Sequence, residues 1–319
     1  MKNIYFIIVP QTHPLDSLGP AQLFYEAKDN GADINLHFVS STLDKELDSA
    51  IGLGFSKLTP YKEFELFKDD IIVIPGIDFS LLIDTNFKKE SQGFYTWLNS
   101  QYNNGATLVS VCTGAFLLGD AGLLKGKKAT THWKAFDDFE QKFPDTELLK
   151  NRLFVENERI YTSAGMLSGI DLCLYLVEKE YGIKFAVEVA KEVVMYFRRG
   201  ESDPQLSIFL QYRNHLDTRI HSAQDFISSN LESAFTIEDI AETVNMSARN
   251  LTRQFKKTAG ITIGDYLAKL RVEQSVNLLA EGYTMDYVAQ KCGLKSTNQL
   301  RTLLKKHEGV IPVDVNTLP

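Results

Sequence analysis

The feature that most constrains the fold of this 319-residue chain is a repeat in its last third. The stretch from Thr236 to Gly260 reads TIEDIAETVNMSARNLTRQFKKTAG, and the stretch from Thr284 to Gly309 reads TMDYVAQKCGLKSTNQLRTLLKKHEG. The first halves of the two stretches align with a shift of 48 positions and the second halves with a shift of 49, so one residue is inserted between them. Two copies of one short pattern predict two copies of one supersecondary unit.

Each copy carries the signals of a helix, a short turn and a second helix. Thr236 and Thr284 are predicted N-caps, because each precedes acidic residues in a first helical turn. Ser247 and Ser296 are predicted to cap the second helices, and Gly260 suits the position after a helix end. This order is typical of a helix-turn-helix unit, whose second helix enters the major groove of DNA.

Helical periodicity assigns the two faces of each second helix. Leu251 and Phe255, like Leu300 and Leu304, are four positions apart and are predicted to point inward. The outward side chains are predicted DNA contacts, with a plain solvated surface as the alternative. They are Arg249, Thr252, Arg253, Lys256, Thr297, Asn298, Arg301, Thr302 and Lys305. Arginine can pair with guanine and asparagine with adenine, whereas lysine more often meets phosphate.

The charge distribution supports local rather than general DNA contact. The net charge of −7 excludes a polycation that coats nucleic acid. From Asp217 to Pro319 there are 12 basic and 12 acidic side chains, so this part is neutral. No acid lies between Glu242 and Asp265 or between Asp286 and Glu308, where the basic side chains cluster.

Residues from about 217 to the end resemble the DNA-binding domain of AraC-family transcription regulators. The resemblance rests on DIAETVNMSARNLTRQFKK, on the connector GITIGDYLAKLRVEQSVNLL, and on VAQKCGL followed by GVIP. The connector is predicted to form one long helix. This helix would let the second helices of the two helix-turn-helix units enter successive major grooves roughly 34 Å apart. The resemblance implies promoter DNA as a partner, and RNA polymerase if the protein is an activator.

In the first two hundred residues, short apolar runs alternate with segments whose apolar residues recur at helical spacing. Strands are predicted at 4–9, 34–39, 71–74, 107–111 and 160–162. Helices are predicted to begin near Gly19, Gln92, Gly114, Thr131, Ser168 and Lys184. This alternation predicts an α/β fold, a flavodoxin-like parallel sheet covered by helices on both faces, followed by the all-α domain with its two helix-turn-helix units.

The junction TLVSVCTGAFLLGDAGLL reads as a buried strand, a sharp turn at Cys112 and a helix. A nucleophile elbow has this form, with the side chain above the strand end and backbone N–H groups nearby. Such a position can lower the pKa of a thiol and stabilise an oxyanion. The alternative is a buried structural cysteine. Cys173 and Cys292 are predicted to lie in the core.

The text VCTGAFLLGDAGLLKGKKATTHW, with PLDSLGPAQLF and YTSAGMLSGIDLCLYLVE, resembles the DJ-1/PfpI superfamily over about residues 3–198. It is most similar to the branch fused to AraC-type domains, and it is similar to isonitrile hydratases. The resemblance implies a ligand pocket at the carboxyl ends of the strands. Its predicted residues are Asp16, Cys112, Thr113, Ser163, Ala164 and Gly165.

Asp16 and a further candidate, His132, each have two possible roles. Asp16 is either the partner of Cys112 or a helix N-cap ahead of Gly19. His132 is either a base for the thiol or a structural histidine. Thr113 stands where many proteases of the superfamily carry histidine, which argues against protease chemistry.

The predicted organisation is a DJ-1/PfpI-like domain at 1–198, a linker at 199–216 and an AraC-type domain at 217–319. No CxxC pair and no long apolar run is present, so we expect no metal, no cofactor and no membrane span, and a cytoplasmic location. The main hypothesis is a homodimeric transcription regulator, not an enzyme, controlled by a small nitrogen-containing metabolite. The alternatives are a cysteine-dependent hydratase or amidohydrolase fused to a DNA-binding module, and a redox switch at Cys112.

Overall fold

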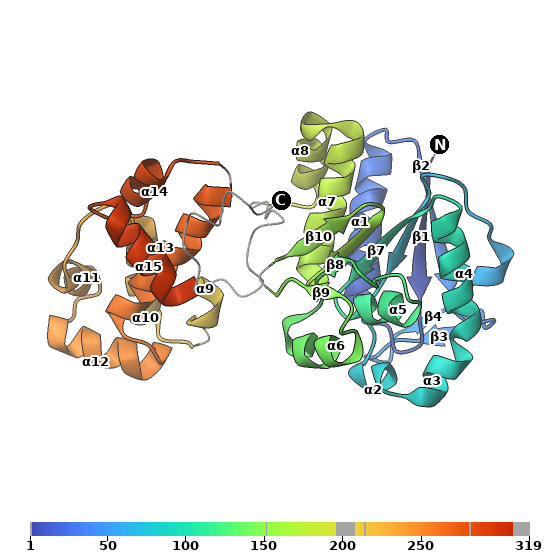
Figure 1. Cartoon of the computed structure of the whole chain (residues 1–319), viewed down its shortest axis with the longest axis horizontal. Helices are drawn as coiled ribbons and strands as arrows, with labels where there is room; N and C mark the ends of the chain where they lie inside the picture. Colours follow the sequence, from blue (N-terminus) through green and yellow to red (C-terminus); the bar gives the residue numbers. More distant parts are fainter. Residues whose placement is uncertain (1, 151, 196–207, 214, 281, 309–319) are drawn as a thin grey trace. The chain divides into compact units, whose positions relative to one another are not determined.

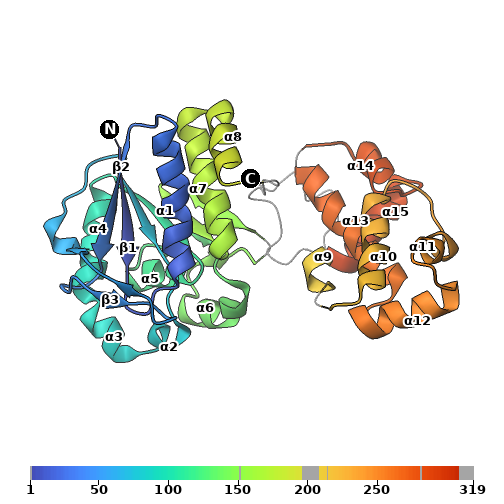
Figure 2. The same cartoon turned by 180° about the vertical axis from the view of Figure 1, so that it is seen from behind.

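The computed structural model describes residues 2–150, 152–195, 208–213, 215–280 and 282–308. The chain divides into two compact units, Met1–Gln205 and Leu206–Pro319, each drawn in Figures 1 and 2. Among the residues described, no helix is long and apolar enough to cross a membrane. The boundaries 1–198, 199–216 and 217–319 stay predictions, since much of the expected linker lies outside the described residues.

The first unit is built on a seven-stranded sheet in the order β10-β11-β7-β6-β1-β2-β5. All neighbouring strands are parallel except β10 and β11, which form an antiparallel edge. The bounds are β1 (Lys2–Ile8), β2 (Ile34–Ser40), β5 (Thr59–Pro60), β6 (Ile71–Ile74), β7 (Thr107–Val111), β10 (Phe154–Asn157) and β11 (Ile160–Ser163). All four residues of β6 are buried, as expected for a strand covered on both faces. The five predicted strands are confirmed.

Helices cover both faces of this sheet, as Figure 1 shows. One apolar core lies under α1 (Pro14–Asp29), α7 (Met166–Tyr181) and α8 (Ile183–Glu192). The other lies under α4 (Gln92–Asn103), α5 (Gly114–Asp120) and α6 (Phe136–Lys142). The shorter elements are β3 (Leu47–Asp48), β4 (Gly54–Phe55), β8 (Lys128–Ala129), β9 (Glu147–Leu148), α2 (Phe79–Leu82), α3 (Thr85–Glu90) and the 3₁₀ turns η1 (Tyr61–Glu63) and η2 (Trp133–Ala135).

The start of α1 corrects one expectation from the sequence. The sequence prediction starts this helix near Gly19, one residue before Pro20. In the structure α1 begins at Pro14, with His13 as its N-cap and Pro20 inside the helix. Asp16 is therefore not an N-cap; it lies in the first turn of α1 with a fully buried side chain.

The second unit contains only helices among its described residues. They are α9 (Ile208–Gln211), α10 (Thr218–Ser229), α11 (Ile237–Thr243), α12 (Ala248–Ala259), α13 (Ile263–Ala280), α14 (Met285–Lys291) and α15 (Thr297–Glu308). The predicted long connector is confirmed as α13, which supplies Leu270 to one apolar core and Val272 to another. The first core gathers α10, α11 and α12, and the second gathers α14 and α15.

The repeat is confirmed as two helix-turn-helix units, α11–α12 and α14–α15. The hydroxyls of Thr236, Thr284, Ser247 and Ser296 all accept a hydrogen bond from the backbone three residues on, as the prediction of four N-caps requires. Gly260 follows α12 in the left-handed conformation, at φ 74°. Its counterpart Gly309 lies outside the described residues.

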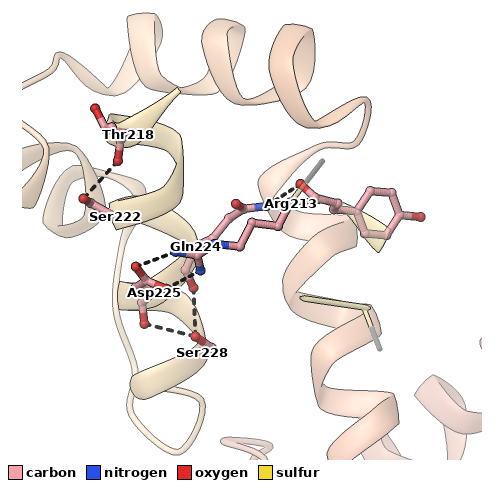
Figure 3. Close-up of polar contacts among 7 residues, drawn as sticks. Arg213, Thr218, Ser222, Gln224, Asp225 and Ser228 are labelled. Atoms are coloured by element: carbon pink, nitrogen blue, oxygen red, sulfur yellow. Dashed lines mark hydrogen bonds and ion pairs between the residues drawn. The ribbon is translucent and has the colours of Figure 1, made fainter. Parts of the chain in front are cut away.

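Part of the predicted linker packs into the second unit (Figure 3). The two terminal nitrogens of Arg213 donate hydrogen bonds to the two carboxylate oxygens of Asp225 on α10. The buried side chain of Gln224 donates to the backbone carbonyl of Tyr212 at 2.7 Å. The backbone N–H of Ile208 donates to Glu273 on α13, also at 2.7 Å. Residues 208–213 are thus held against α10 and α13.

Candidate functional site

Cys112 occupies a strained turn between β7 and α5. Its backbone has φ 56°, in the left-handed region that side chains other than glycine rarely adopt. The turn is held from both sides: the N–H of Cys112 donates to the carbonyl of Ser163 at 3.0 Å, and the hydroxyl of Thr131 donates to the carbonyl of Cys112 at 3.0 Å. The sharp elbow predicted from the sequence is therefore present, and the Cys112 side chain is only 5% exposed.

Three predicted site residues converge on one glycine that the sequence analysis missed. A methyl group on Gly76 would lie 2.5 Å from Oδ2 of Asp16, 2.9 Å from Oγ1 of Thr113 and 3.0 Å from Cβ of Cys112. The N–H of Gly76 donates to Oδ2 of Asp16 at 3.1 Å. A side chain at this position would separate the three residues, so close packing requires glycine. The available signal was the Pro-Gly pair that follows the buried strand β6.

The hydroxyl of Thr113 is bonded to the loop after β6. Its hydroxyl donates to the carbonyl of Ile77 at 3.1 Å and accepts from the N–H of Ile77 at 3.0 Å. The loop after β6 is therefore fastened to the elbow. This is a structural role that the sequence analysis did not anticipate for Thr113.

Burial dominates the electrostatics of this cluster. It raises the pKa of Asp16 to about 7, although hydrogen bonds from Gly76 and Cys112 lower it in part. Burial and the nearby charge of Asp16 raise the pKa of the Cys112 thiol, against smaller lowering contributions from Thr113. The thiol is therefore protonated at neutral pH and is a weak nucleophile. Oδ1 of Asp16 is buried and has no hydrogen-bond partner among the described residues.

The remaining predicted pocket residues lie beside the elbow. A hollow of about 240 Å³ is lined by His132, Trp133, Leu153, Ala164, Gly165, Met166, Leu167 and Ser168. Ser163 is not part of this lining, and its buried hydroxyl donates to the carbonyl of Ser110 at 3.2 Å. Asp16, Cys112 and Thr113 do not line the hollow either. The backbone bond between Cys112 and Ser163 joins the two groups of residues.

His132 is a half-buried part of this hollow. Its Nδ1 accepts a hydrogen bond from the N–H of Lys134 at 3.4 Å. Its pKa is lowered by burial first, then by the charges of Lys134 and His13. The groups that act on the Cys112 thiol are Asp16 and Thr113, not His132. Within the described part of the chain, no cluster of three histidine, cysteine or acidic side chains could hold a metal ion.

The helices α12 and α15 present the faces predicted for them. Leu251, Phe255, Leu300 and Leu304 are buried, as the periodicity predicts. Arg249, Thr252, Arg253, Lys256, Asn298, Arg301, Thr302 and Lys305 are exposed. Thr297, the first residue of α15, is half-buried. Cys173 and Cys292 are fully buried core residues, and no cysteine is in a disulfide.

Comparison with protein families agrees with both units. The DJ-1/PfpI family profile matches residues 2–179, and a helix-turn-helix domain profile matches residues 240–317. The chain therefore belongs to the DJ-1/PfpI family and carries a C-terminal helix-turn-helix domain. The two resemblances inferred from the sequence are confirmed.

Individual relatives include regulators and an enzyme. The chain is 29% identical over 223 residues to the HTH-type transcriptional regulator GbdR of Pseudomonas aeruginosa, covering 69% of this chain and 60% of that protein. It is 31% identical over 184 residues to an isonitrile hydratase of Pseudomonas putida, covering 58% of this chain and 74% of that enzyme. The chain thus spans about 60% of the length of the regulators it matches.

A solved structure supports the fold of the first unit. The crystal structure of an AraC family transcriptional regulator from Pseudomonas putida matches with a TM-score of 0.51 and 20% identity. The match covers 60% of this chain and 100% of that one. At this identity the likeness establishes a shared fold.

Proposed function

We propose that this protein is a sequence-specific, AraC-type transcription regulator that binds promoter DNA and is not an enzyme. The observation that carries the proposal is the pair of capped helix-turn-helix units, each presenting outward Arg, Lys, Thr or Asn side chains on its second helix. The similarity to GbdR supports the same role. The protonated, buried thiol of Cys112 supports a first unit that binds rather than reacts.

The first unit is the proposed sensor for a small, nitrogen-containing metabolite. The hollow beside His132 and Gly165 offers a space at the carboxyl ends of the strands, where α/β sheets bind ligands. Asp16 does not line this hollow, but it stays a proposed ligand residue because its buried Oδ1 has no hydrogen-bond partner among the described residues and an amine or amide could satisfy it. We further propose a homodimer, in which the ligand shifts the population of two arrangements, and contact with RNA polymerase if the protein activates.

The test of DNA binding is fluorescence anisotropy with labelled DNA from upstream of the protein's own gene. Scrambled DNA of equal length is the comparison, and both are titrated across salt concentrations. We expect selective binding with a steep salt slope. Lys256→Ala should weaken binding to every sequence and reduce that slope by about one unit. Lys257→Ala, on the same helix but outside the predicted face, is the matched control.

The test of the sensor is a thermal-shift screen of nitrogen-containing metabolites. A ligand that binds the folded state raises the unfolding midpoint of the first unit. Asp16→Asn should remove or weaken the shift for a ligand that contacts this carboxyl. The same variant should stabilise the unliganded unit more at pH 8 than at pH 5. The reason is that the raised pKa of Asp16 contributes stability that is fully present below its usual pKa of 3.8 and is lost as pH rises from there through about 7.

A cysteine-dependent hydratase or amidohydrolase is the second candidate, favoured by the 31% identity to isonitrile hydratase. This enzyme would need Cys112 as a thiolate and Asp16 beside it. Iodoacetamide labelling across pH measures the thiolate directly. Rapid labelling of Cys112 at neutral pH, together with turnover of isonitriles or nitriles that Cys112→Ser abolishes, would establish the enzyme. Absence of labelling at neutral pH would also remove a redox switch at this residue.

A further inference from the structure

Helix α12, the second helix of the first helix-turn-helix unit, contains a hydrogen-bonded pair of side chains. Nη2 of Arg253 donates to Oδ1 of Asn250 at 3.1 Å, across one helical turn. Asn250 is half-buried, and its backbone N–H donates to the capping hydroxyl of Ser247 at 3.3 Å. The backbone of Asn250 is therefore held in the first turn of the helix, while Arg253 is exposed.

The second helix of the other helix-turn-helix unit, α15, contains a pair of the same residue types at the same spacing. Nη1 of Arg301 donates to Oδ1 of Asn298 in α15, at the longer distance of 3.5 Å. Both pairs join residues three positions apart, with the asparagine nearer the helix N-terminus. Side chains at this spacing lie next to each other on a helix surface. The two pairs are offset by one position in the repeat, because Asn250 aligns with Gln299 under the shift of 49, so each helix forms its own asparagine–arginine pair.

We propose that Asn250 and Asn298 are positioning residues, which hold the guanidinium groups of Arg253 and Arg301 in a fixed orientation for reading guanine. This inference rests on the proposed DNA-binding function. An asparagine reads adenine with its oxygen and nitrogen together. In both pairs that oxygen accepts a hydrogen bond from an arginine, so the proposal assigns Asn298 to support a guanine contact in place of the adenine contact expected from the sequence.

The physical basis is the freedom of an exposed arginine. A free guanidinium samples many rotamers and meets phosphates as readily as base edges. One hydrogen bond to the asparagine removes much of this freedom before DNA arrives, so less entropy is lost on binding. A guanidinium has five N–H donors, so four remain and two of them can contact O6 and N7 of a guanine.

The experiment measures base preference with the full-length protein. The promoter site is titrated in its original form and with each base pair changed singly, for the unmodified protein, Asn250→Ala, Arg253→Ala and the double variant. We expect Arg253→Ala to lower affinity for the original site about 10- to 100-fold and to abolish preference at one base pair. Asn250→Ala should lower preference at that same base pair by about 3- to 10-fold.

The double variant separates positioning from direct reading. If Asn250 acts through Arg253, adding Asn250→Ala to Arg253→Ala changes nothing further, so the two effects are not additive. Asn250→Asp keeps the acceptor and should restore preference at that base pair, while its negative charge weakens binding to all sequences. Asn298→Ala should have a smaller effect than Asn250→Ala, because its hydrogen bond is longer. Lys257→Ala controls for loss of general charge, and circular dichroism checks that every variant folds.

Two outcomes overturn the inference. The first is that Asn250→Ala alters preference at a different base pair from Arg253→Ala with additive costs, which means that the asparagine reads a base itself. The second is that Asn250→Ala leaves the profile unchanged. The proposed function is judged separately by the unmodified protein: if it does not distinguish the promoter from scrambled DNA, the proposed function fails and this inference fails with it.

Discussion

The two helix-turn-helix units share one pattern but differ in what supports them. The first has a core with large aromatic residues, where Phe255 meets the ring of Tyr266 edge-on at 5.5 Å and α9 and α10 add further cover. The core of the second is formed by Val272, Val288, Ala289, Cys292, Leu300 and Leu304, none of them aromatic. A repeated sequence therefore specifies the same local helices on two foundations of different size.

The turns of the two units show the same difference at one backbone position. Asn245 and Gly293 are equivalent and both adopt positive φ, 52° and 65°. A side chain on Gly293 would lie 2.2 Å from the carbonyl oxygen of Leu231, which belongs to the loop after α10. The turn of the second helix-turn-helix unit therefore packs directly against the loop after α10, and only glycine fits there. Lys291 reinforces this contact through an ion pair with Glu232 at 3.0 Å.

The largest expected difference is in the cores. Phe255→Ala, in the first helix-turn-helix unit, should lower the free energy of unfolding of the C-terminal helical domain by about 3–5 kcal/mol, because it removes a fully buried aromatic side chain. Leu304→Ala in the smaller core should cost about 2–3 kcal/mol. Urea denaturation of the full-length protein, followed by circular dichroism, measures both. Equal losses would mean that the two cores contribute alike despite their composition.

The turn position should give the next largest contrast. Gly293→Ala should cost about 2–4 kcal/mol, because the added methyl group meets the Leu231 carbonyl and because alanine is strained at positive φ. Asn245→Gly should change the free energy of unfolding by no more than about 0.5 kcal/mol. The same denaturation curves decide. A loss of stability below about 1 kcal/mol for Gly293→Ala would show that this contact between the two helix-turn-helix units is not required for stability.

The DNA-reading faces should be more nearly equal. Arg253→Ala and Arg301→Ala should each weaken specific binding by about 1–3 kcal/mol, as for the loss of a bidentate arginine contact. Each should relax preference at a different part of the promoter, because each unit is expected to enter its own major groove. Anisotropy titrations with singly changed sites measure this. Loss of preference at the same base pairs in both variants would contradict the prediction that the two helix-turn-helix units contact separate major grooves.

The smallest contrast is at the helix starts. Thr236 exchanges hydrogen bonds with Asp239, whereas Thr284 accepts one from the backbone of Tyr287 at 3.4 Å. Thr236→Ala should cost about 1–2 kcal/mol and Thr284→Ala about 0.5–1 kcal/mol. Hydrogen bonds from Thr236 lower the pKa of Asp239, so its contribution is present above its usual pKa and lost as pH falls. Unfolding midpoints at pH 7 and pH 3 should therefore differ more before than after Thr236→Ala.

The sequence predicts the repeated elements well, because their signals are local. The caps at Thr236 and Ser247, the buried strands and the elbow at Cys112 each depend on a few neighbouring residues. The start of α1 is missed because Pro20 usually ends a helix, whereas here it lies inside one.

The candidate site is harder to predict, because it depends on residues distant in the sequence. Gly76 brings Asp16 of α1 together with Cys112 and Thr113 of the β7–α5 turn, and the Pro-Gly pair after β6 does not by itself show which residues it approaches. The hydroxyl of Thr113 is taken by Ile77, a partner 36 positions away. The burial that raises the pKa of Cys112 is likewise a property of the assembled fold, so the sequence alone left reactive and structural roles open.

The buried carboxyl of Asp16 has a consequence for the stability of the elbow itself. With a pKa raised to about 7, it is mostly protonated in mildly acidic solution and mostly ionised in mildly alkaline solution. It does not line the hollow beside His132, so its charge develops within the packed contact with Gly76 and Cys112. A rise in pH therefore places a buried negative charge next to the strained turn and weakens the packing that holds it.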